Sequence, residues 1–289
     1  MKRRDLLTGV CSGLAFSAGN GFLWKFAQDS APNNYGDVAL TVSEPAAAIE
    51  EAPTVLEKVR FFENEFVDDI YLDQSEFGLM TAVIQRLENV QKVVGHGNFN
   101  LLNFDDMLKY AKHYDSIGEF PQVELDFMEK IFFTEAKRYG FYGEKVTANL
   151  TATVNDHDVY RVPYTGHFLF KGKSINYYNK LIGDMGPNIV LTSGIRSVVK
   201  QMHLFLSKCA KSNGNLSKAS RSLAPPGHSY HGIGDFDVGR LGWGADNFTS
   251  KFALTDEFKR MQDLGYVQIR YTEDNQLGVR FEPWHIKVI

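Results

Sequence analysis

Two histidines and one carboxylate in the C-terminal part of the sequence could hold a divalent metal ion. His231 and Asp237 belong to a glycine-rich stretch, residues 225–237, and His285 follows near the end of the chain. Imidazoles and a carboxylate are ligands that zinc prefers, and three protein ligands leave one coordination position open for water or substrate. An open position is typical of a catalytic zinc site. A further carboxylate, Glu282, would remain free to move protons.

The spacing of the acidic residues supports a charged site. Asp235 and Asp237 are two residues apart on an expected strand, so both side chains should point to one face. Because buried unpaired carboxylates are costly, such a pair requires a cation or hydrogen-bond donors. Glu282 and His285 would lie on opposite faces of a regular strand. Pro283 removes a ladder donor and favours a bulge or an edge there, so both side chains could point at one ion.

The segments that must position these residues alternate irregularly between helix and strand patterns. This alternation predicts an α+β fold with a small, mainly antiparallel sheet and flanking helices, preceded by an α-helical region. The expected strands are residues 146–154, 159–162, 189–192, 236–238, 266–271 and 279–288, and the expected helices are residues 174–182, 197–209 and 255–264.

The preceding region, residues 56–142, has the periodicity of three or four packed helices. Apolar residues recur at three- and four-residue steps between Phe77 and Val94. Asn103 precedes a run with acidic residues in its first turn, as a helix start should. The pattern repeats over residues 122–139, and Gly140 ends it.

The N-terminus resembles a bacterial twin-arginine export signal. Arg3 and Arg4 precede a mildly apolar run, which predicts a periplasmic or otherwise exported protein. An ordinary secretory signal or an uncleaved anchor helix is the alternative. The predicted organisation is therefore an export signal at 1–27, a flexible linker at 28–55, the helical region at 56–142 and a domain with the candidate zinc site at 143–289.

Composition excludes several other classes. The net charge of −4 argues against a nucleic-acid partner. Nothing after residue 30 has the unbroken apolar length of a membrane span, so no stable span is expected once the signal is cleaved. The two cysteines, Cys11 and Cys209, exclude a disulfide scaffold and a cysteine-rich zinc site. The oligomeric state stays open.

Three segments together resemble a known family of peptidases. They are residues 193–201, with Arg196 and Gln201, residues 226–234, and residues 282–285. In this order and spacing they look like the zinc D-alanyl-D-alanine carboxypeptidases of the VanY type, a set related to Hedgehog-like domains and lysostaphin-type enzymes. The resemblance covers roughly residues 165–289.

The resemblance implies roles for individual residues. His231 and His285 would bind Zn2+, and Glu282 would be the catalytic base. Arg196 would bind the substrate or polarise its scissile carbonyl. Ser229 would hydrogen-bond the terminal carboxylate of the substrate. As a site residue with a less defined role, Gln201 would support the arginine or line the site.

One departure from the family pattern concerns the aspartate ligand. The family places six residues between the first histidine and this aspartate, but position 238 is valine here. After a one-residue deletion in the turn, Asp237 becomes the expected ligand and Asp235 the fallback. Asp235 could instead orient a ligating histidine from behind.

The resemblance implies a zinc-dependent D-alanyl-D-alanine carboxypeptidase that acts on peptidoglycan stem peptides through zinc-activated water. An L,D-carboxypeptidase or a D,D-endopeptidase of the same family is the first alternative. The second is a non-catalytic wall-binding module stabilised by zinc. Glu282 argues against the module, because a structural zinc site needs no extra carboxylate.

Overall fold

A computed structural model describes residues 53–289, which belong to one compact unit. The predicted export signal and nearly all of the predicted linker lie outside the described residues. No helix in the described part has the length and apolar character that crossing a membrane requires. The elements are α1 (Val55–Arg60), α2 (Gln74–Val94), α3 (His96–Phe99), α4 (Phe104–His113), α5 (Gln122–Phe133), η1 (Ala136–Tyr139), η2 (Asp156–Asp158), β1 (Val159–Arg161), β2 (Phe168–Phe170), α6 (Lys173–Met185), β3 (Ile189–Ser193), α7 (Val198–Lys211), α8 (Leu216–Ser220), η3 (Tyr230–Gly232), β4 (Phe236–Arg240), η4 (Gly244–Phe248), η5 (Ser250–Leu254), α9 (Asp256–Asp263) and β5 (His285–Ile286).

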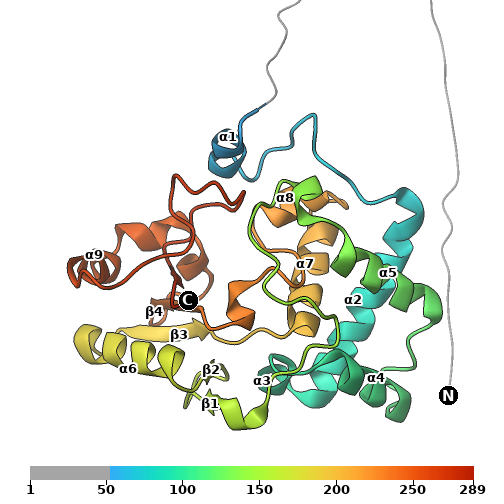
Figure 1. Ribbon diagram of the computed structural model, residues 1–289, viewed down its shortest axis with the longest axis horizontal. Helices are drawn as coiled ribbons and strands as arrows, with labels where there is room; N and C mark the ends of the chain where they lie inside the picture. Colours follow the sequence, from blue (N-terminus) through green and yellow to red (C-terminus); the bar gives the residue numbers. More distant parts are fainter. Residues whose placement is uncertain (1–52) are drawn as a thin grey trace, which may run out of the picture. The chain divides into compact units, whose positions relative to one another are not determined.

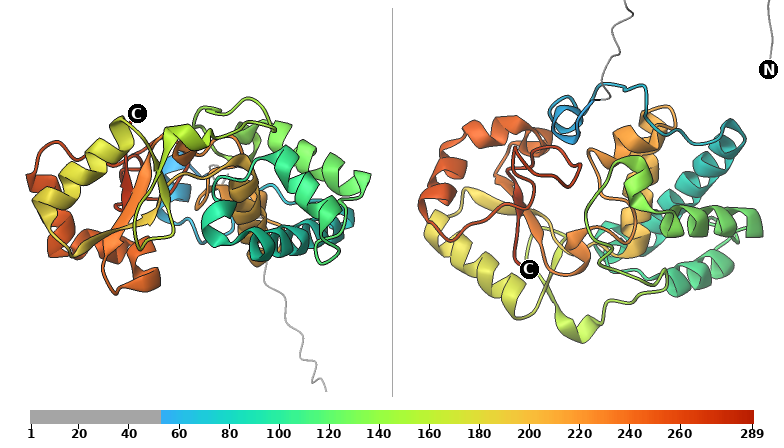
Figure 2. Two further views of the ribbon diagram at one scale, coloured as in Figure 1. Left: turned by 90° about the horizontal axis from the view of Figure 1, so that it is seen from below. Right: turned by 45° about the horizontal axis from the view of Figure 1, so that its top comes forward.

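Two apolar cores organise the described residues. Helices α2, α4, α5 and α7 enclose one core, and α6 and α9 pack beside the sheet around the other (Figure 1). Two further views show the same separation of the helical half from the sheet half (Figure 2). Helix α7 contributes Val199, Met202 and Phe205 to the helical core, while the segment before it continues from β3. One helix therefore connects the helical half to the sheet that positions the site.

The central sheet has three strands in the order β3-β4-β5, and both pairings are antiparallel. Its register places Asp237 between Ser193 on one side and His285 on the other. The register shifts between Leu191 and Ser193, so β3 bends where it approaches the site. A separate antiparallel pair, β1-β2, lies outside this sheet. The α+β class with small antiparallel sheets is thus confirmed.

Local sequence signals explain the helices that were predicted correctly. The amide of Asp106 donates to the Asn103 side chain at 2.8 Å, which caps α4 as expected. Ser197 and Thr255 cap α7 and α9 in the same way. In α2 the buried residues Met80, Val83, Leu87 and Val90 follow the predicted periodicity.

The prediction of one helix over residues 122–139 was wrong. Helix α5 ends at Phe133, because the backbone at Thr134 is extended and its hydroxyl donates to the Lys130 carbonyl at 2.6 Å. A 3-10 turn, η1, follows and ends at Gly140, which has a φ of 79°. The end of the helical pattern was therefore placed correctly, but its continuity was not.

Three predicted strands are absent or shortened among the described residues. Residues 146–154 form no strand, because this segment crosses the helical core and buries Leu150 there instead of pairing. Residues 266–271 contribute only an isolated bridge between Ile269 and Ile286. Of residues 279–288 only β5 is a strand, since a turn containing Pro283 precedes it.

A strap formed by residues 61–72 crosses from α1 to α2 and is held by Arg221. The Arg221 guanidinium donates to Asp69 at 2.6 and 3.0 Å and to the Asn64 carbonyl at 2.7 Å. The side chains of Arg221 and Asp69 are 3% and 0% exposed. Burial acts to raise the pKa of Asp69, but hydrogen bonds from Arg221 and Asn215 outweigh it and hold the pKa below its ordinary value.

We expect Asp69→Ala to lower the free energy of unfolding by about 3–5 kcal/mol, because it leaves the buried Arg221 charge without a partner. Urea denaturation measures this change. Asp68→Ala is the matched control: its partner is Lys58 and its side chain is 48% exposed, so the loss should stay below about 1 kcal/mol. Because the folded-state pKa of Asp69 is lowered, its contribution is present at neutral pH and is lost as the pH falls below about 4. Equal losses for the two variants would contradict a buried anchor.

Candidate metal centre

The structure brings His231, Asp237 and His285 together. One potential ligand atom from each residue lies within 4.8 Å of the others, and all three residues are buried. The pairing of β4 with β5 places Asp237 directly across from His285. His231 arrives from η3, and its Nε2 lies 3.2 Å from Asp237 Oδ1. Three segments that are distant in sequence therefore converge on one point.

A backbone carbonyl fixes the orientation of His231. Its Nδ1 lies 2.8 Å from the Gly194 carbonyl oxygen. A carbonyl only accepts hydrogen bonds, so Nδ1 carries the proton and Nε2 of the neutral ring presents its lone pair to the site. Position 194 must be glycine, because a Cβ there would lie 2.0 Å from the Phe168 carbonyl oxygen. Burial lowers the pKa of His231 to about 4, which keeps the ring neutral at pH 7.

The buried atoms that face the centre of this cluster fit a cation. His231 Nε2 and Asp237 Oδ1 are both buried and make no hydrogen bond within the described residues, although they are only 3.2 Å apart. A neutral imidazole lone pair and a carboxylate oxygen are both acceptors, so neither can satisfy the other. Such an arrangement is costly unless a cation binds between them. The nitrogen, nitrogen and oxygen donor set is the one that zinc prefers.

Asp235 orients the third potential ligand. His285 Nε2 lies 3.2 Å from Asp235 Oδ2, while Nδ1 of the same ring lies 3.3 Å from Asp237 Oδ1. Asp235, the fallback ligand, thus contacts Nε2, the ring nitrogen that points away from the cluster. Asp237 lies beside Nδ1, the ring nitrogen that points into it. Arg270 donates to Asp235 at 2.7 and 3.1 Å. A carboxylate behind a ligating histidine fixes its tautomer and raises its basicity.

The carboxylates around His285 raise its pKa and oppose the effect of its burial. Burial acts to lower the pKa of His285, but hydrogen bonds to Asp235 and Glu282 outweigh it and raise the pKa to about 9. The pKa values of Asp235 and Asp237 are both well below the ordinary value, because neighbouring cationic and donor groups outweigh their burial. The cluster therefore keeps two carboxylates ionised at neutral pH.

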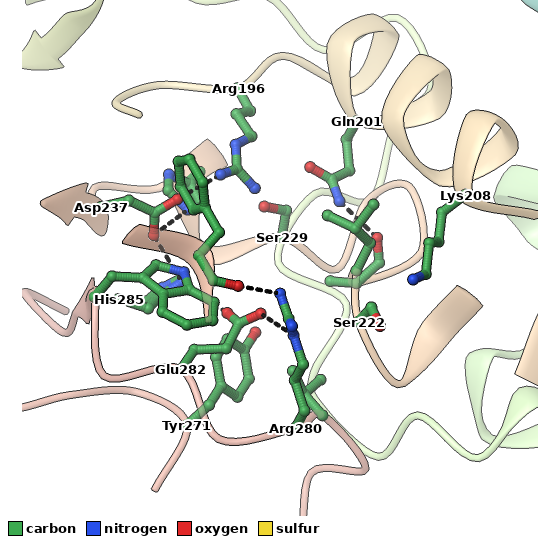
Figure 3. A pocket seen from close by; sticks show the side chains of 16 residues that line it. Arg196, Gln201, Lys208, Ser222, Ser229, Asp237, Tyr271, Arg280, Glu282 and His285 are labelled. Atoms are coloured by element: carbon green, nitrogen blue, oxygen red, sulfur yellow. Dashed lines mark hydrogen bonds and ion pairs between the residues drawn. The ribbon is translucent and has the colours of Figure 1, made fainter. Parts of the chain in front are cut away.

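Arg196 approaches the cluster from the turn between β3 and α7. Its Nε donates to Ser193 Oγ at 2.9 Å, and its Nη2 donates to Asp237 Oδ2 at 2.6 Å. Asp237 thus uses one oxygen for the arginine and keeps the other for the centre of the cluster. Arg196 also lines the pocket in front of the triad, where the guanidinium can meet a substrate oxygen (Figure 3).

A turn brings the side chains of Glu282 and His285 to the same side, whereas a regular strand would place them on opposite faces. The His285 amide donates to the Glu282 carbonyl at 3.1 Å, so the backbone reverses around Pro283. As a result Glu282 Oε2 lies 3.6 Å from His285 Nδ1 and faces the same pocket as the triad (Figure 3). Glu282 is next to the cluster without being part of the three-residue set, which suits a group that moves protons.

The triad opens onto a pocket of about 220 Å³. Ser229 and Gln201 line it, and their contact with a substrate stays a prediction. Gln201 Nε2 donates to the Ala224 carbonyl at 2.6 Å. This side chain therefore lines the site and also holds the loop that contains Ala224. No described bond joins it to Arg196. The Ser229 side chain faces the same space (Figure 3).

Sequence reasoning missed several residues that complete the site. Arg270 holds Asp235, and its guanidinium lies 3.9 Å from the centre of the Tyr230 ring. Tyr271 is buried and contacts the His285 ring edge-on at 4.9 Å between ring centres. Both are the last residues of the expected strand 266–271, so only their position directly before a loop could have suggested a role. Arg280 was treated as a strand residue, yet it lines the pocket beside Glu282.

Comparison with known proteins agrees with the family inferred from the motifs. The family model described as VanY, D-alanyl-D-alanine carboxypeptidase, matches residues 175–289. The matched residues include all of those that carry the resemblance from Gln201 to His285, so the match agrees with the predicted family over that part of the chain. No relative was found among curated proteins.

Several solved structures are similar over about half of the chain. The LD-carboxypeptidase LdcB is 22% identical, with a TM-score of 0.40, and the match covers 47% of this chain and 70% of that one. A mutant of the vancomycin-resistance D,D-pentapeptidase VanY in complex with Zn(II) is 17% identical, with a TM-score of 0.38, over 52% of this chain and 88% of that one. VanYB in complex with D-alanine-D-alanine is 20% identical, with a TM-score of 0.38, over 52% of this chain and 86% of that one.

We expect the purified protein to bind one zinc ion, and His231→Ala, Asp237→Ala and His285→Ala each to abolish stoichiometric binding. Asp235→Asn should retain binding with an affinity about 10- to 100-fold lower, because it removes only the group behind His285. Competition with a chromogenic chelator measures both effects. His157→Ala, an exposed histidine in η2, is the matched control and should bind as the wild type does. Full binding by the Asp237 variant would contradict this ligand set.

Proposed function

We propose that the chain is a zinc-dependent D-alanyl-D-alanine carboxypeptidase that acts on peptidoglycan stem peptides. The observation that carries the proposal is the pair of unpartnered buried acceptors, His231 Nε2 and Asp237 Oδ1, beside a carboxylate that faces the same pocket. The match of residues 175–289 to the carboxypeptidase family supports the reaction class. The described solved structures include a zinc complex and a D-alanine-D-alanine complex of VanY proteins, which support the ion and the substrate class.

His231, Asp237 and His285 would hold the zinc ion. When bound, zinc supplies a Lewis acid and lowers the pKa of a water molecule enough to make it a nucleophile at neutral pH. The protein contributes the orientation of its donors. The Gly194 carbonyl and Asp235 each hold the outer nitrogen of one histidine.

Glu282 is the proposed general base. Its carboxylate faces the pocket next to His285, within reach of a proton on a molecule bound in front of the triad. The same group would return that proton to the leaving amine. Arg196 stabilises negative charge that develops on the scissile carbonyl oxygen, because its guanidinium stays charged and lies at the pocket wall. Ser229, which lines the same pocket, would donate to a substrate carboxylate.

Two alternatives rest on different observations. An L,D-carboxypeptidase or a D,D-endopeptidase would use the same metal centre, and the similarity to the LD-carboxypeptidase LdcB is the reason to test the L,D reaction. A wall-binding module with a structural zinc ion would have no use for Glu282 in the pocket. The pocket residues favour an enzyme over the module.

We expect Glu282→Gln to reduce turnover about 10²- to 10⁴-fold and to leave zinc binding intact, because it removes the base and no ligand. Mass spectrometry of muropeptides measures the product: loss of one alanine from pentapeptides identifies the D,D-carboxypeptidase. Loss of the next residue from tetrapeptides identifies the L,D reaction, and conversion of dimers to monomers identifies an endopeptidase.

The controls separate catalysis from binding. Glu129→Gln changes an exposed glutamate on α5 and should leave turnover unchanged. A chelator should abolish turnover of the wild type. An active Glu282→Gln variant would exclude this residue as the base, and a zinc-loaded wild type without any hydrolysis would favour the binding module.

We also propose that the protein is exported by the twin-arginine route, which carries folded proteins. The support is the pair Arg3 and Arg4 before an apolar run. Replacing both by lysine should leave the precursor in the cytoplasm, as fractionation and immunoblotting would detect. Lys2→Gln, which keeps the arginine pair, is the control and should be exported. Undiminished export of the double variant would contradict this route.

A further inference from the structure

The pocket has a second end that the proposed reaction does not use. Lys208, Ser222 and Arg280 line it on the side away from Asp237 and His285 (Figure 3). Along α7, Lys208 lies two helical turns beyond Gln201, which is about 10 Å along the axis. An extended peptide covers such a distance with about three residues. The pocket therefore reaches past the space that one terminal alanine would fill.

Polar groups at this end are buried without partners. Ser222 is 6% exposed, and its hydroxyl makes no hydrogen bond within residues 53–289. The same holds for Arg280 Nε. A buried hydroxyl and a buried guanidinium nitrogen normally have acceptors. Acceptor atoms supplied by a ligand would satisfy these donors.

The arginine at this end is held in place from behind. Its guanidinium lies 4.9 Å from the ring centres of Phe62 and Trp284, and its Nη2 donates to the Phe248 carbonyl at 3.1 Å. The backbone amide of Arg280 donates to the Arg221 carbonyl at 2.8 Å, which places Ser222 on the neighbouring segment. The guanidinium is thus positioned before any ligand arrives, and little freedom is lost on binding.

Two carboxylates already contact these cations. Arg280 Nε lies 3.6 Å from Glu282 Oε1, too far for a hydrogen bond. Lys208 Nζ contacts Glu63 of the strap at 3.2 Å, and the Glu63 side chain is 57% exposed. Exposed ion pairs contribute little, so a ligand carboxylate can replace Glu63 at low cost. The strap therefore brings a carboxylate to this end of the pocket without filling it.

We propose that Lys208, Ser222 and Arg280 form a subsite for a carboxylate of the bound peptide, at the end of the pocket opposite the metal-ligand triad. This inference rests on the proposed function, since it assumes a peptide substrate. Lysine and arginine supply charge, and Ser222 supplies a directed donor. Because Ser229 is assigned to the terminal carboxylate, the group that fits this subsite is a side-chain carboxylate of a residue farther along the peptide.

The test uses three peptides: one with both carboxylates free, one amidated at its C-terminus and one amidated at its side chain. Wild type, Lys208→Gln and Ser222→Ala are compared by kinetics. Lys211→Gln is the matched control, since this exposed lysine ends the same helix outside the pocket. Arg280 is not changed, because it contacts the proposed base. Calorimetry on the Glu282→Gln background gives the affinity of each uncleaved peptide.

Lys208→Gln should raise KM for the free peptide about tenfold with kcat changed less than about twofold, and Ser222→Ala should raise it about threefold. Amidating the recognised carboxylate should weaken wild-type binding by a similar factor and remove the effect of Lys208→Gln. This should occur for the peptide amidated at its side chain and not for the peptide amidated at its C-terminus. If side-chain amidation does not reduce the effect, or if Lys211→Gln has the same effect, the subsite is refuted.

The calorimetric arm keeps the two proposals separate. A wild type that hydrolyses none of the three peptides contradicts the proposed function. A dependence of binding on Lys208 and on one carboxylate would nevertheless support the subsite. Hydrolysis without any such dependence has the opposite meaning, because it supports the peptidase and refutes the subsite.

Discussion

The constraint on which the site depends is the close approach of two buried acceptors, His231 Nε2 and Asp237 Oδ1. At 3.2 Å, without a hydrogen bond between them, they raise the free energy of the folded protein unless a positive charge lies beside them, either a metal ion or the proton of His285. The surroundings prevent relief by rearrangement. The Gly194 carbonyl fixes the histidine, and Arg196 occupies the other oxygen of the aspartate. The protein thus keeps an arrangement that is unfavourable without a positive charge and favourable with one.

The pairing of the central sheet holds Asp237 in that arrangement. Strand β4 places Asp237 beside His285 on one neighbour and Ser193 on the other, and Ser193 in turn accepts from Arg196. Asp235, two residues earlier, supports the outer nitrogen of the same histidine. One short strand therefore supplies both a potential ligand and the group behind another ligand. A shift of one residue in its register would move both carboxylates away from the ring.

The sequence was most informative where local chemistry decides the structure. Caps such as Asn103 and the periodicity of α2 depend on neighbouring residues, and they were predicted correctly. The three residues of the candidate metal centre could be selected because two histidines and a carboxylate form a zinc donor set and lie in segments that resemble a known family. What could not be predicted depends on distant partners. Residues 146–154 have strand composition, but Leu150 packs into the helical core, so tertiary contacts override the local preference.

The same distinction explains why the second end of the pocket was overlooked. Arg280 and Lys208 are ordinary cations in the sequence, 72 residues apart, and only the fold brings both into one pocket. The strap completes this end through Phe62 and Glu63, and the buried Arg221–Asp69 pair fixes the strap. A segment upstream of the matched family region thereby shapes the pocket in front of the candidate metal centre. Since α7 belongs to the helical core and also lines this pocket, the helical half contributes to the walls of the pocket as well as to stability.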